Sequence, residues 1–257
     1  LKKDVRTGLL CSDILSYGKE RKLVGKCYRW VNIDRKECIT PLDFGFDCRL
    51  ECSSQRKGEV LNALRDLMTN EWKGCRVFWM GGESLLPEPV ESDFFAVMKR
   101  HCDELGYGRG GMSDTVYEAY KNVSCLFKAA EERVRENIQD DLDWMKKSSE
   151  NEIINEYGID FNDPFAGMFQ REGAEFRFTV NTTKRIAYSF ETTKIFYSDG
   201  KMDINMDDGL PYFDPLPDLL GYGRNHSEPG EWIRDIIDFT DELPEGISLL
   251  DSITFSW

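Results

Sequence analysis

The chain has 257 residues, of which 40% are hydrophobic and 12% aromatic, enough for one large packed domain or two small ones. Its 33 Lys and Arg residues against 47 Asp and Glu residues give a net charge of −14, which disfavours direct binding to nucleic acid or to a membrane surface. No apolar run approaches the ~20 residues of a membrane span, and the first residues lack the apolar segment of a signal peptide.

The first third of the chain predicts a strand, helix and strand. Residues 22–33 and 44–52 have strand character, and the second segment alternates apolar and polar residues. Gly74 is placed to end the helix that follows, and residues 75–80 then form a short buried strand. The strands at 44–52 and 75–80 would form a βαβ unit with a right-handed crossover. The apolar stripe of the helix consists of Val60, Leu61, Leu64, Leu67, Met68 and Trp72.

Helices dominate the next segment. A helix over residues 92–105 is closed by Gly106, and a long amphipathic helix is predicted over residues 113–147. A short helix with a capping box follows over residues 149–158. We expect the apolar stripe of the long helix to pack against the sheet. This stripe consists of Val116, Tyr120, Val123, Phe127, Ala130, Val134, Ile138, Leu142 and Met145.

After Pro164 the apolar residues recur with a period of two, which is typical of strands. Asp199 and Gly200 predict a hairpin turn between two of these strands. A helix is expected near residues 231–239, and residues 247–257 close the chain as a strand. The strands before that helix are predicted at residues 175–180, 185–190, 194–197 and 201–206.

These elements predict an α+β fold in two parts. Residues 1–157 form an N-terminal mixed α/β part that contains the long helix 113–147. Residues 158–257 form an acidic C-terminal part, an antiparallel β-meander with one helix.

The eight cysteines all lie in the first half of the chain and form no CxxC pair. We interpret them as free, buried thiols in a reducing compartment, so the predicted localisation is cytoplasmic. No metal site and no cofactor are predicted. The chain also lacks the short motifs of serine hydrolases, zinc proteases and P-loop proteins, so no catalytic residue is assigned.

The stretch LGYGR occurs twice, at Leu105–Arg109 and at Leu220–Arg224. Gly106 and Gly221 are both predicted to have a positive φ and to end the segment before them. This structural interpretation leaves the arginine of each copy unexplained.

A candidate anion site combines the first LGYGR loop with the loop that follows the strand at residues 75–80. Glycines allow a ligand to approach the backbone, an arginine attracts a phosphate, and the amides at the start of a helix bind anions. The candidate residues are Gly81, Gly82, Glu83, Arg109, Gly110, Gly111 and Ser113.

A second candidate site lies in the acidic C-terminal segment. Residues 199–257 carry 3 Lys and Arg against 14 Asp and Glu, a net charge of −11. Such a surface attracts a basic protein partner. The candidate residues are Asp199, Asp203, Asp207, Asp208, Asp235, Asp238, Asp241 and Glu242.

Two functions therefore stay open. The first is a soluble acidic interaction domain without catalysis, of the inhibitor, immunity-protein or mobile-element-antagonist type. The second is an enzyme or binding domain for a phosphorylated small molecule that uses the Gly81–Ser84 and Arg109 loops.

Overall fold

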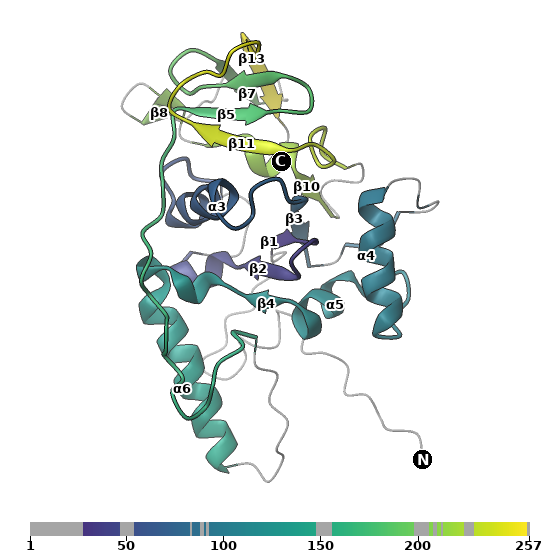
Figure 1. The fold of residues 1–257 in the computed structure, drawn as a ribbon, viewed down its shortest axis with the longest axis vertical. Helices are drawn as coiled ribbons and strands as arrows, with labels where there is room; N and C mark the ends of the chain where they lie inside the picture. Colours follow the sequence, from purple (N-terminus) through teal and green to yellow (C-terminus); the bar gives the residue numbers. More distant parts are fainter. Residues whose placement is uncertain are drawn as a thin grey trace.

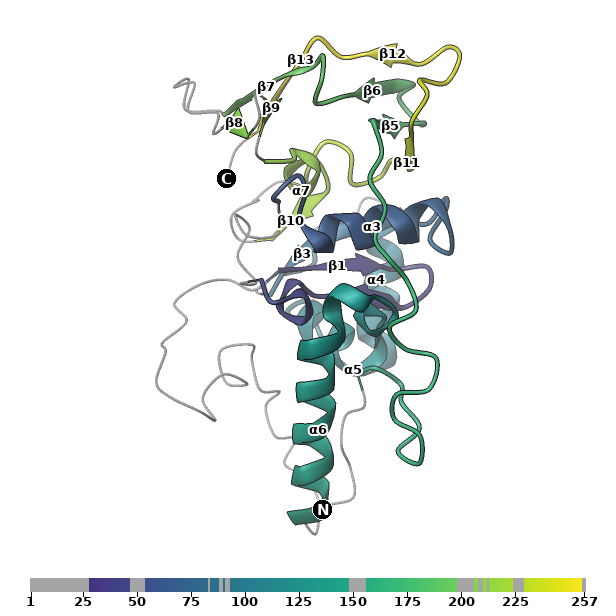
Figure 2. The same ribbon diagram turned by 90° about the vertical axis from the view of Figure 1, so that its left-hand side faces the viewer.

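The structure is a computed structural model, and it describes residues 28–46, 54–82, 84–87, 90, 93–147, 156–197, 206–207, 210–211, 213–223 and 229–255. Helix α3 (Glu59–Thr69) lies between two β-sheets, as Figures 1 and 2 show. The chain contains both helices and mixed sheets, which confirms the α+β class.

The lower sheet in Figure 1 has five strands in the order β10-β3-β1-β2-β4. β1 pairs with β2 and β3 in antiparallel orientation, whereas β10 joins β3 and β4 joins β2 in parallel orientation. The strands are β1 (Tyr28–Asn32), β2 (Glu37–Ile39), β3 (Val77–Gly81), β4 (Lys121–Asn122) and β10 (Gly221–Tyr222).

Helix α3 is buried around most of its circumference. The predicted apolar stripe lies in the core, and Asn62, Ala63 and Arg65 are buried as well. A helix packed between two layers has little solvent face, which explains this pattern. Trp30 and Trp79 pack in the same core cluster, as does Phe239 of the upper sheet, so one core joins the two halves of the chain. The division at residue 157 stays a sequence-based hypothesis.

The opposite face of the lower sheet is covered by helices α4 (Asp93–Glu104) and α5 (Met112–Ala119). α4 agrees with the predicted helix at residues 92–105, and Gly106 ends it with a φ of 77°. Phe94 meets Phe78 of β3 edge to face, with ring centroids 5.1 Å apart. The two faces of the sheet therefore belong to two separate core clusters.

The upper sheet has four strands in the order β11-β5-β6-β12. They are β5 (Phe178–Asn181), β6 (Ile186–Tyr188), β11 (Ile237–Thr240) and β12 (Ser248–Leu249). β7 (Lys194–Tyr197) pairs with β13 (Ser252–Phe255), and β8 (Met206–Asp207) pairs with β9 (Leu210–Pro211). The short helix α7 (Leu216–Leu219) leads into β10.

The predicted antiparallel meander is wrong in detail. β12 pairs with β6 and β13 pairs with β7, both in parallel orientation. The chain leaves β11 at one edge of the sheet and crosses to the opposite edge to form β12, a connection that local periodicity does not encode. The hairpin turn predicted at Asp199 and Gly200 lies outside the described residues.

The long helix predicted over residues 113–147 is also wrong, because α5 and α6 (Glu131–Lys147) are separate. Between them lie β4 and two 3₁₀ turns, η2 (Ser124–Leu126) and η3 (Lys128–Ala130). Lys121 N donates to Lys36 O at 2.9 Å and Val123 N donates to Cys38 O at 2.8 Å. Pairing with β2 therefore overrides the helical spacing in a run of residues with modest helix propensity. α6 extends away from the sheet at the lower end of the molecule (Figures 1 and 2).

Two shorter predictions also differ from the structure. Phe44 belongs to a 3₁₀ turn, η1 (Pro41–Phe44), which Gly45 ends with a φ of 75°, so the predicted strand at 44–52 does not begin there. Residues 47–53 lie outside the described ranges, as does most of the predicted helix 149–158. The helix predicted at residues 231–239 is replaced by turns and by β11, whose alternating burial suits a strand with one core face.

Within the described ranges, none of the helices combines the length and apolar composition that crossing a membrane requires. Four cysteines lie in these ranges, Cys38, Cys75, Cys102 and Cys125, and all four are free thiols.

Candidate functional site

The two loops of the predicted anion site meet at the carboxyl end of β3. Arg109 lies in the loop after α4, and its Nε donates to Leu86 O at 2.7 Å. Leu86 N donates in return to Arg109 O at 3.0 Å. Gly110 approaches Leu85, since a Cβ added at Gly110 would stand 3.7 Å from Leu85 Cδ2. The structure therefore brings Gly110 and Arg109 beside the loop that begins at Gly81.

The glycines at this junction serve close packing between strands. Gly81 and Gly223 pack face to face, and a Cβ added at Gly223 would stand 3.2 Å from Gly81 Cα. The Ser84 hydroxyl is buried, donates to Gly81 O at 2.6 Å and lies 3.0 Å from Tyr222 O. The strand end that we predicted as an open crevice is thus partly filled by the second LGYGR copy.

The remaining residues of the predicted anion site are less closely joined. Gly82 is half-buried in the turn after β3, and Glu83 lies outside the described residues. Gly111 is the N-cap of α5 and is buried, and Ser113 lies in the first turn of that helix. Asp114 also lies in this first turn and already places a negative charge at the helix N-terminus.

The two LGYGR stretches have different local structures. Gly106 ends α4 and Tyr107 N donates back to Cys102 O at 2.9 Å, as predicted for a helix-terminating glycine. Gly221 lies in β10 opposite Trp79, and its predicted positive φ is wrong; Gly223 has the positive φ, 150°. The repeat is one short sequence used in two conformations.

The predicted acidic face is spread over several elements. Asp199, Asp203 and Asp208 lie outside the described residues, and Asp207 lies in the short strand β8. The Asp235 carboxylate is less accessible to a partner protein than the carboxylate of an exposed acid. Its side chain is 10% exposed and accepts a hydrogen bond from Asn181 Nδ2 at 2.7 Å.

Asp238 occupies the edge strand β11. Its Oδ1 accepts from the N–H of Phe239 at 2.9 Å, and its Oδ2 lies 3.9 Å from Lys73 Nζ. The Asp238 carboxylate thus accepts a hydrogen bond from a backbone N–H that could otherwise pair with an additional strand. Asp238 therefore has a local structural role at the sheet edge.

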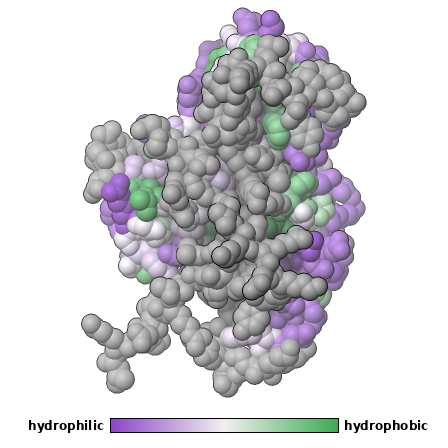
Figure 3. Space-filling model, turned by 180° about the vertical axis from the view of Figure 1, so that it is seen from behind, coloured by the Kyte–Doolittle hydropathy of each residue, from purple (hydrophilic) through white to green (hydrophobic). Residues whose placement is uncertain are grey.

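A run of exposed acids lies in the turn between β11 and β12, residues 241–247. Asp241, Glu242 and Glu245 are exposed, and Leu243 between them is 38% exposed. We call this segment the acidic turn. In Figure 2 the chain that joins β11 to β12 lies at the upper end of the molecule, opposite α6. Seen from behind, the upper rim of the coloured surface is mostly hydrophilic (Figure 3).

Hydrogen bonds fix the backbone of the acidic turn. Thr240 Oγ1 donates to Glu242 O at 3.0 Å, and Ile247 N donates to Pro244 O at 3.2 Å. Gly246 has a φ of 75° and lies against the Arg185 guanidinium, which offsets part of the local negative charge. Sequence reasoning selected Asp241 and Glu242 but missed Leu243 and Glu245. The sequence does contain a signal for this turn, because an apolar residue stands between acids and is followed by Pro and Gly.

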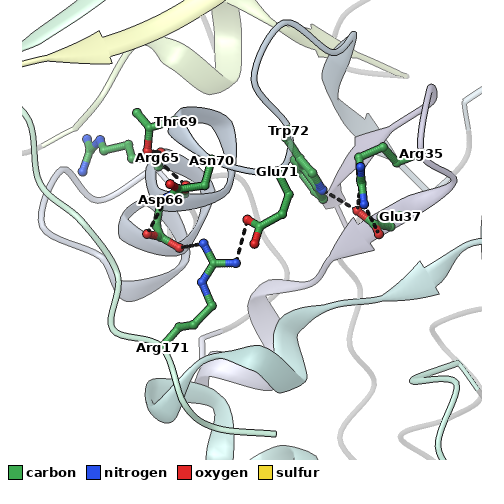
Figure 4. Close-up of polar contacts among 9 residues, drawn as sticks. All are labelled: Arg35, Glu37, Arg65, Asp66, Thr69, Asn70, Glu71, Trp72 and Arg171. Carbon is green, nitrogen blue, oxygen red and sulfur yellow. Dashed lines mark hydrogen bonds and ion pairs between the residues drawn. The ribbon is translucent and has the colours of Figure 1, made fainter. Parts of the chain in front are cut away.

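Ion pairs elsewhere hold the layers together. Figure 4 shows Arg171 between Asp66 and Glu71 at the end of α3, with its Nη1 2.7 Å from the Glu71 carboxylate. Trp72 Nε1 donates to Glu37 Oε2 at 2.6 Å in the same view. The Arg171 contacts attach the segment before β5 to the end of α3, and the Trp72 contact attaches the end of α3 to β2. We assign these contacts a structural role.

A buried carboxyl group, Asp43, lies near the start of α6. Its side chain accepts hydrogen bonds from Asn122 Nδ2 at 2.8 Å and from Tyr157 OH at 3.0 Å. Burial and the nearby Glu156 carboxylate raise the pKa of Asp43 to about 7. In the ranges that the structure describes, no group of three or more His, Cys, Asp or Glu side chains is arranged to hold a metal ion.

Comparison of the chain with protein-family models, with curated proteins and with solved structures gave no match.

Proposed function

We propose that the protein is a non-catalytic interaction domain that binds a basic partner protein, in the manner of an inhibitor, an immunity protein or an antagonist of a mobile element. The acidic turn is the proposed contact, with Asp241, Glu242 and Glu245 around Leu243. The observation that carries the proposal is the exposure of Leu243 between acids on a backbone held by its own hydrogen bonds.

This arrangement supplies what a charged interface needs. The carboxylates attract a basic surface over about 8 Å at physiological salt and speed the encounter. Leu243 adds apolar area that is lost from water on contact, worth roughly 25 cal/mol per Å². A turn that is already fixed loses little conformational entropy when it binds.

The experiment uses two charge-reversal variants with the same change in net charge. Glu242→Lys with Glu245→Lys alters the acidic turn, and Glu132→Lys with Asp140→Lys alters exposed acids of α6 at the other end of the molecule. Wild-type protein first captures partners from a lysate of the native host, and the captured basic protein is purified.

Association rates are then measured at low and high ionic strength. We expect the turn variant to associate about tenfold more slowly at low ionic strength, and the α6 variant to associate at the wild-type rate. Leu243→Ala should speed dissociation without changing the association rate. Equal association rates for the two charge variants, or failure to capture any basic protein, would contradict the proposal.

The alternative function, binding of a phosphorylated small molecule, is favoured by one observation. The reciprocal hydrogen bonds between Arg109 and Leu86 bring the two predicted loops together. Titration with inorganic phosphate, followed by nuclear magnetic resonance, tests it. Shifts of the Gly110 and Gly111 amides that are lost in Arg109→Gln would support this alternative, and unshifted amides would remove it.

A further inference from the structure

The chain returns from α6 toward the upper sheet through residues 156–158, and this return segment is anchored on Asp43. Asp43 is buried, and only 1% of the residue is exposed. Its Oδ1 accepts hydrogen bonds from Tyr157 OH at 3.0 Å and from Asn137 Nδ2 of α6 at 3.4 Å. Its Oδ2 accepts from Asn122 Nδ2 of β4 at 2.8 Å. One carboxyl group thus joins α6, β4 and the return segment.

A second carboxyl group shares the same anchor. Asn122 Nδ2 also donates to Glu156 Oε1 at 3.0 Å, so a single amide nitrogen bridges Asp43 and Glu156. Asn122 N donates in addition to Glu156 O at 2.6 Å. The return segment is therefore held by a bridge whose two acceptors repel one another when both are charged.

Hydrogen bonds from Asn122, Ser124 and Tyr157 favour the charged form of Asp43 and lower its pKa, but burial and the Glu156 carboxylate outweigh them. Lys121 is a basic residue near the bridge, and its aliphatic chain packs along Gly158 while the residue as a whole is exposed. The ionisable groups of the packed elements include Arg29 of β1, which interacts with Cys38 of β2, together with Cys125 of η2, Asp140 and Asp141 of α6, and Glu156 and Tyr157 of the return segment.

Burial and Glu156 together raise the pKa of Asp43 to about 7. The folded pKa thus lies above the value of about 4 expected in an unfolded chain. Protonation of Asp43 therefore stabilises the fold fully below about pH 4, and this stabilisation is lost as the pH rises through the folded pKa. Above neutral pH Asp43 is ionised beside the Glu156 side chain.

We propose that Asp43 and Glu156 form a proton-dependent latch, which fastens the return segment and the adjoining part of α6 to the sheet when Asp43 is protonated and loosens them when both carboxyl groups are ionised. The loosening stays local, because the next part of the chain has its own attachments. Phe169 N donates to Cys125 O at 2.8 Å, and Arg171 is bound to Glu71 at 2.7 Å.

Hydrogen exchange of the full chain tests the latch, with the Asn122 amide as reporter because it donates to Glu156 O. Protection factors, corrected for the intrinsic rate, are compared at about pH 6 and about pH 8, on either side of the Asp43 pKa of about 7. We expect protection of Asn122 and of α6 residues 134–138 to fall by about tenfold, since one pH unit above the pKa leaves about a tenth of the group protonated.

Two variants and one control separate the latch from a general loss of stability. Glu156→Gln keeps an acceptor for Asn122 but removes one charge, so the fall in protection between about pH 6 and about pH 8 should be smaller than in wild type, although burial still raises the pKa of Asp43. Asp43→Asn removes the titrating group itself and should give a flat profile. Asp141→Asn is the control, because the pKa of Asp141 is also raised, to about 6, mainly by burial. In this control variant, protection should fall between the two pH values as much as in wild type.

A wild-type protection factor that does not change between the two pH values would overturn the latch. An equal fall in wild type and Glu156→Gln would overturn it as well. If Asp43→Asn does not fold, the half-buried Glu156 still allows the comparison through Glu156→Gln.

Discussion

Arg65 and Asp214 form an ion pair inside the protein, with Nη2 2.7 Å from Oδ2 and side-chain exposures of 5% and 0%. Tyr188 OH donates to the second Asp214 oxygen at 2.5 Å, and Arg65 Nη1 donates to Asn62 Oδ1 at 2.9 Å. Arg65 belongs to α3, Tyr188 to β6 and Asp214 to the segment before α7. The pair therefore joins the central helix to the upper sheet and to the approach of β10.

Removing one member of this pair should be costly. Asp214→Ala leaves the Arg65 guanidinium buried without its counter-charge, and we expect the free energy of unfolding to fall by about 3–5 kcal/mol. The double variant Arg65→Met with Asp214→Asn removes both charges and keeps an oxygen for Tyr188. Its free energy of unfolding should therefore fall less than that of Asp214→Ala. Urea unfolding of wild type, Asp214→Ala and the double variant measures this difference. A loss below about 1 kcal/mol in Asp214→Ala would show that the pair is not isolated from water.

The first LGYGR loop contains a matched pair of glycines. Gly106 has a φ of 77°, whereas no positive φ is found at Gly108, and an added Cβ at either position meets no atom within 4 Å. The two positions therefore differ in backbone conformation and not in the room available for a side chain. Gly106→Ala should lower the free energy of unfolding by about 1 kcal/mol, and Gly108→Ala should leave it unchanged or raise it slightly. Thermal unfolding of both variants gives the comparison, and equal effects would contradict the backbone explanation.

Local patterns predicted the elements whose partners are close in sequence. Helix α3 was predicted because its apolar residues recur with helical spacing, and the same residues are buried in the structure. Helix α4 and its terminating Gly106 follow for the same reason. In both cases local propensity and tertiary packing favour the same conformation.

Elements whose conformation is set by distant partners were not predicted. Lys121 and Asn122 leave the helical pattern because they pair with β2, and the Asn122 side chain binds Asp43, 79 positions away. The contact between Tyr157 and Asp43 spans 114 positions and has no local signature. The same limit applies to the candidate sites. The sequence pattern combined the Arg109 loop and the glycine loop in one hypothetical site, but it did not predict the hydrogen bonds between Arg109 and Leu86 that join them.

Two of the described cysteines should resist modification in the folded protein. Burial raises the pKa of the Cys38 thiol to about 12 and that of the Cys125 thiol to about 11. The reactive thiolate is therefore scarce at about pH 8. Alkylation followed by peptide mass spectrometry should label the half-buried Cys75 first, with Cys38 and Cys125 labelled only after denaturant is added. Rapid native labelling of Cys38 would mean that β2 opens readily.

Arg171 links the segment before β5 to the end of α3 (Figure 4). Its guanidinium contacts the Asp66 and Glu71 carboxylates and lies 5.4 Å from the centroid of the Phe127 ring. A planar, forked cation fits two carboxylates and an aromatic face, whereas an ammonium group is a point charge. Arg171→Ala should lower the free energy of unfolding by about 1–2 kcal/mol, given that the side chain is 22% exposed.

Arg171→Lys keeps the charge but loses the fork, and it should recover less than half of that loss. Arg133→Ala is the matched control, because Arg133 pairs with Glu136 at 3.0 Å on the exposed face of α6 and its side chain is 54% exposed. It should change stability by about 0.5 kcal/mol at most. Urea unfolding at low and high salt distinguishes the two arginines, since the Arg171 contribution includes packing on Phe127 that salt does not screen. Full recovery of stability in Arg171→Lys would show that Arg171 acts only through its charge.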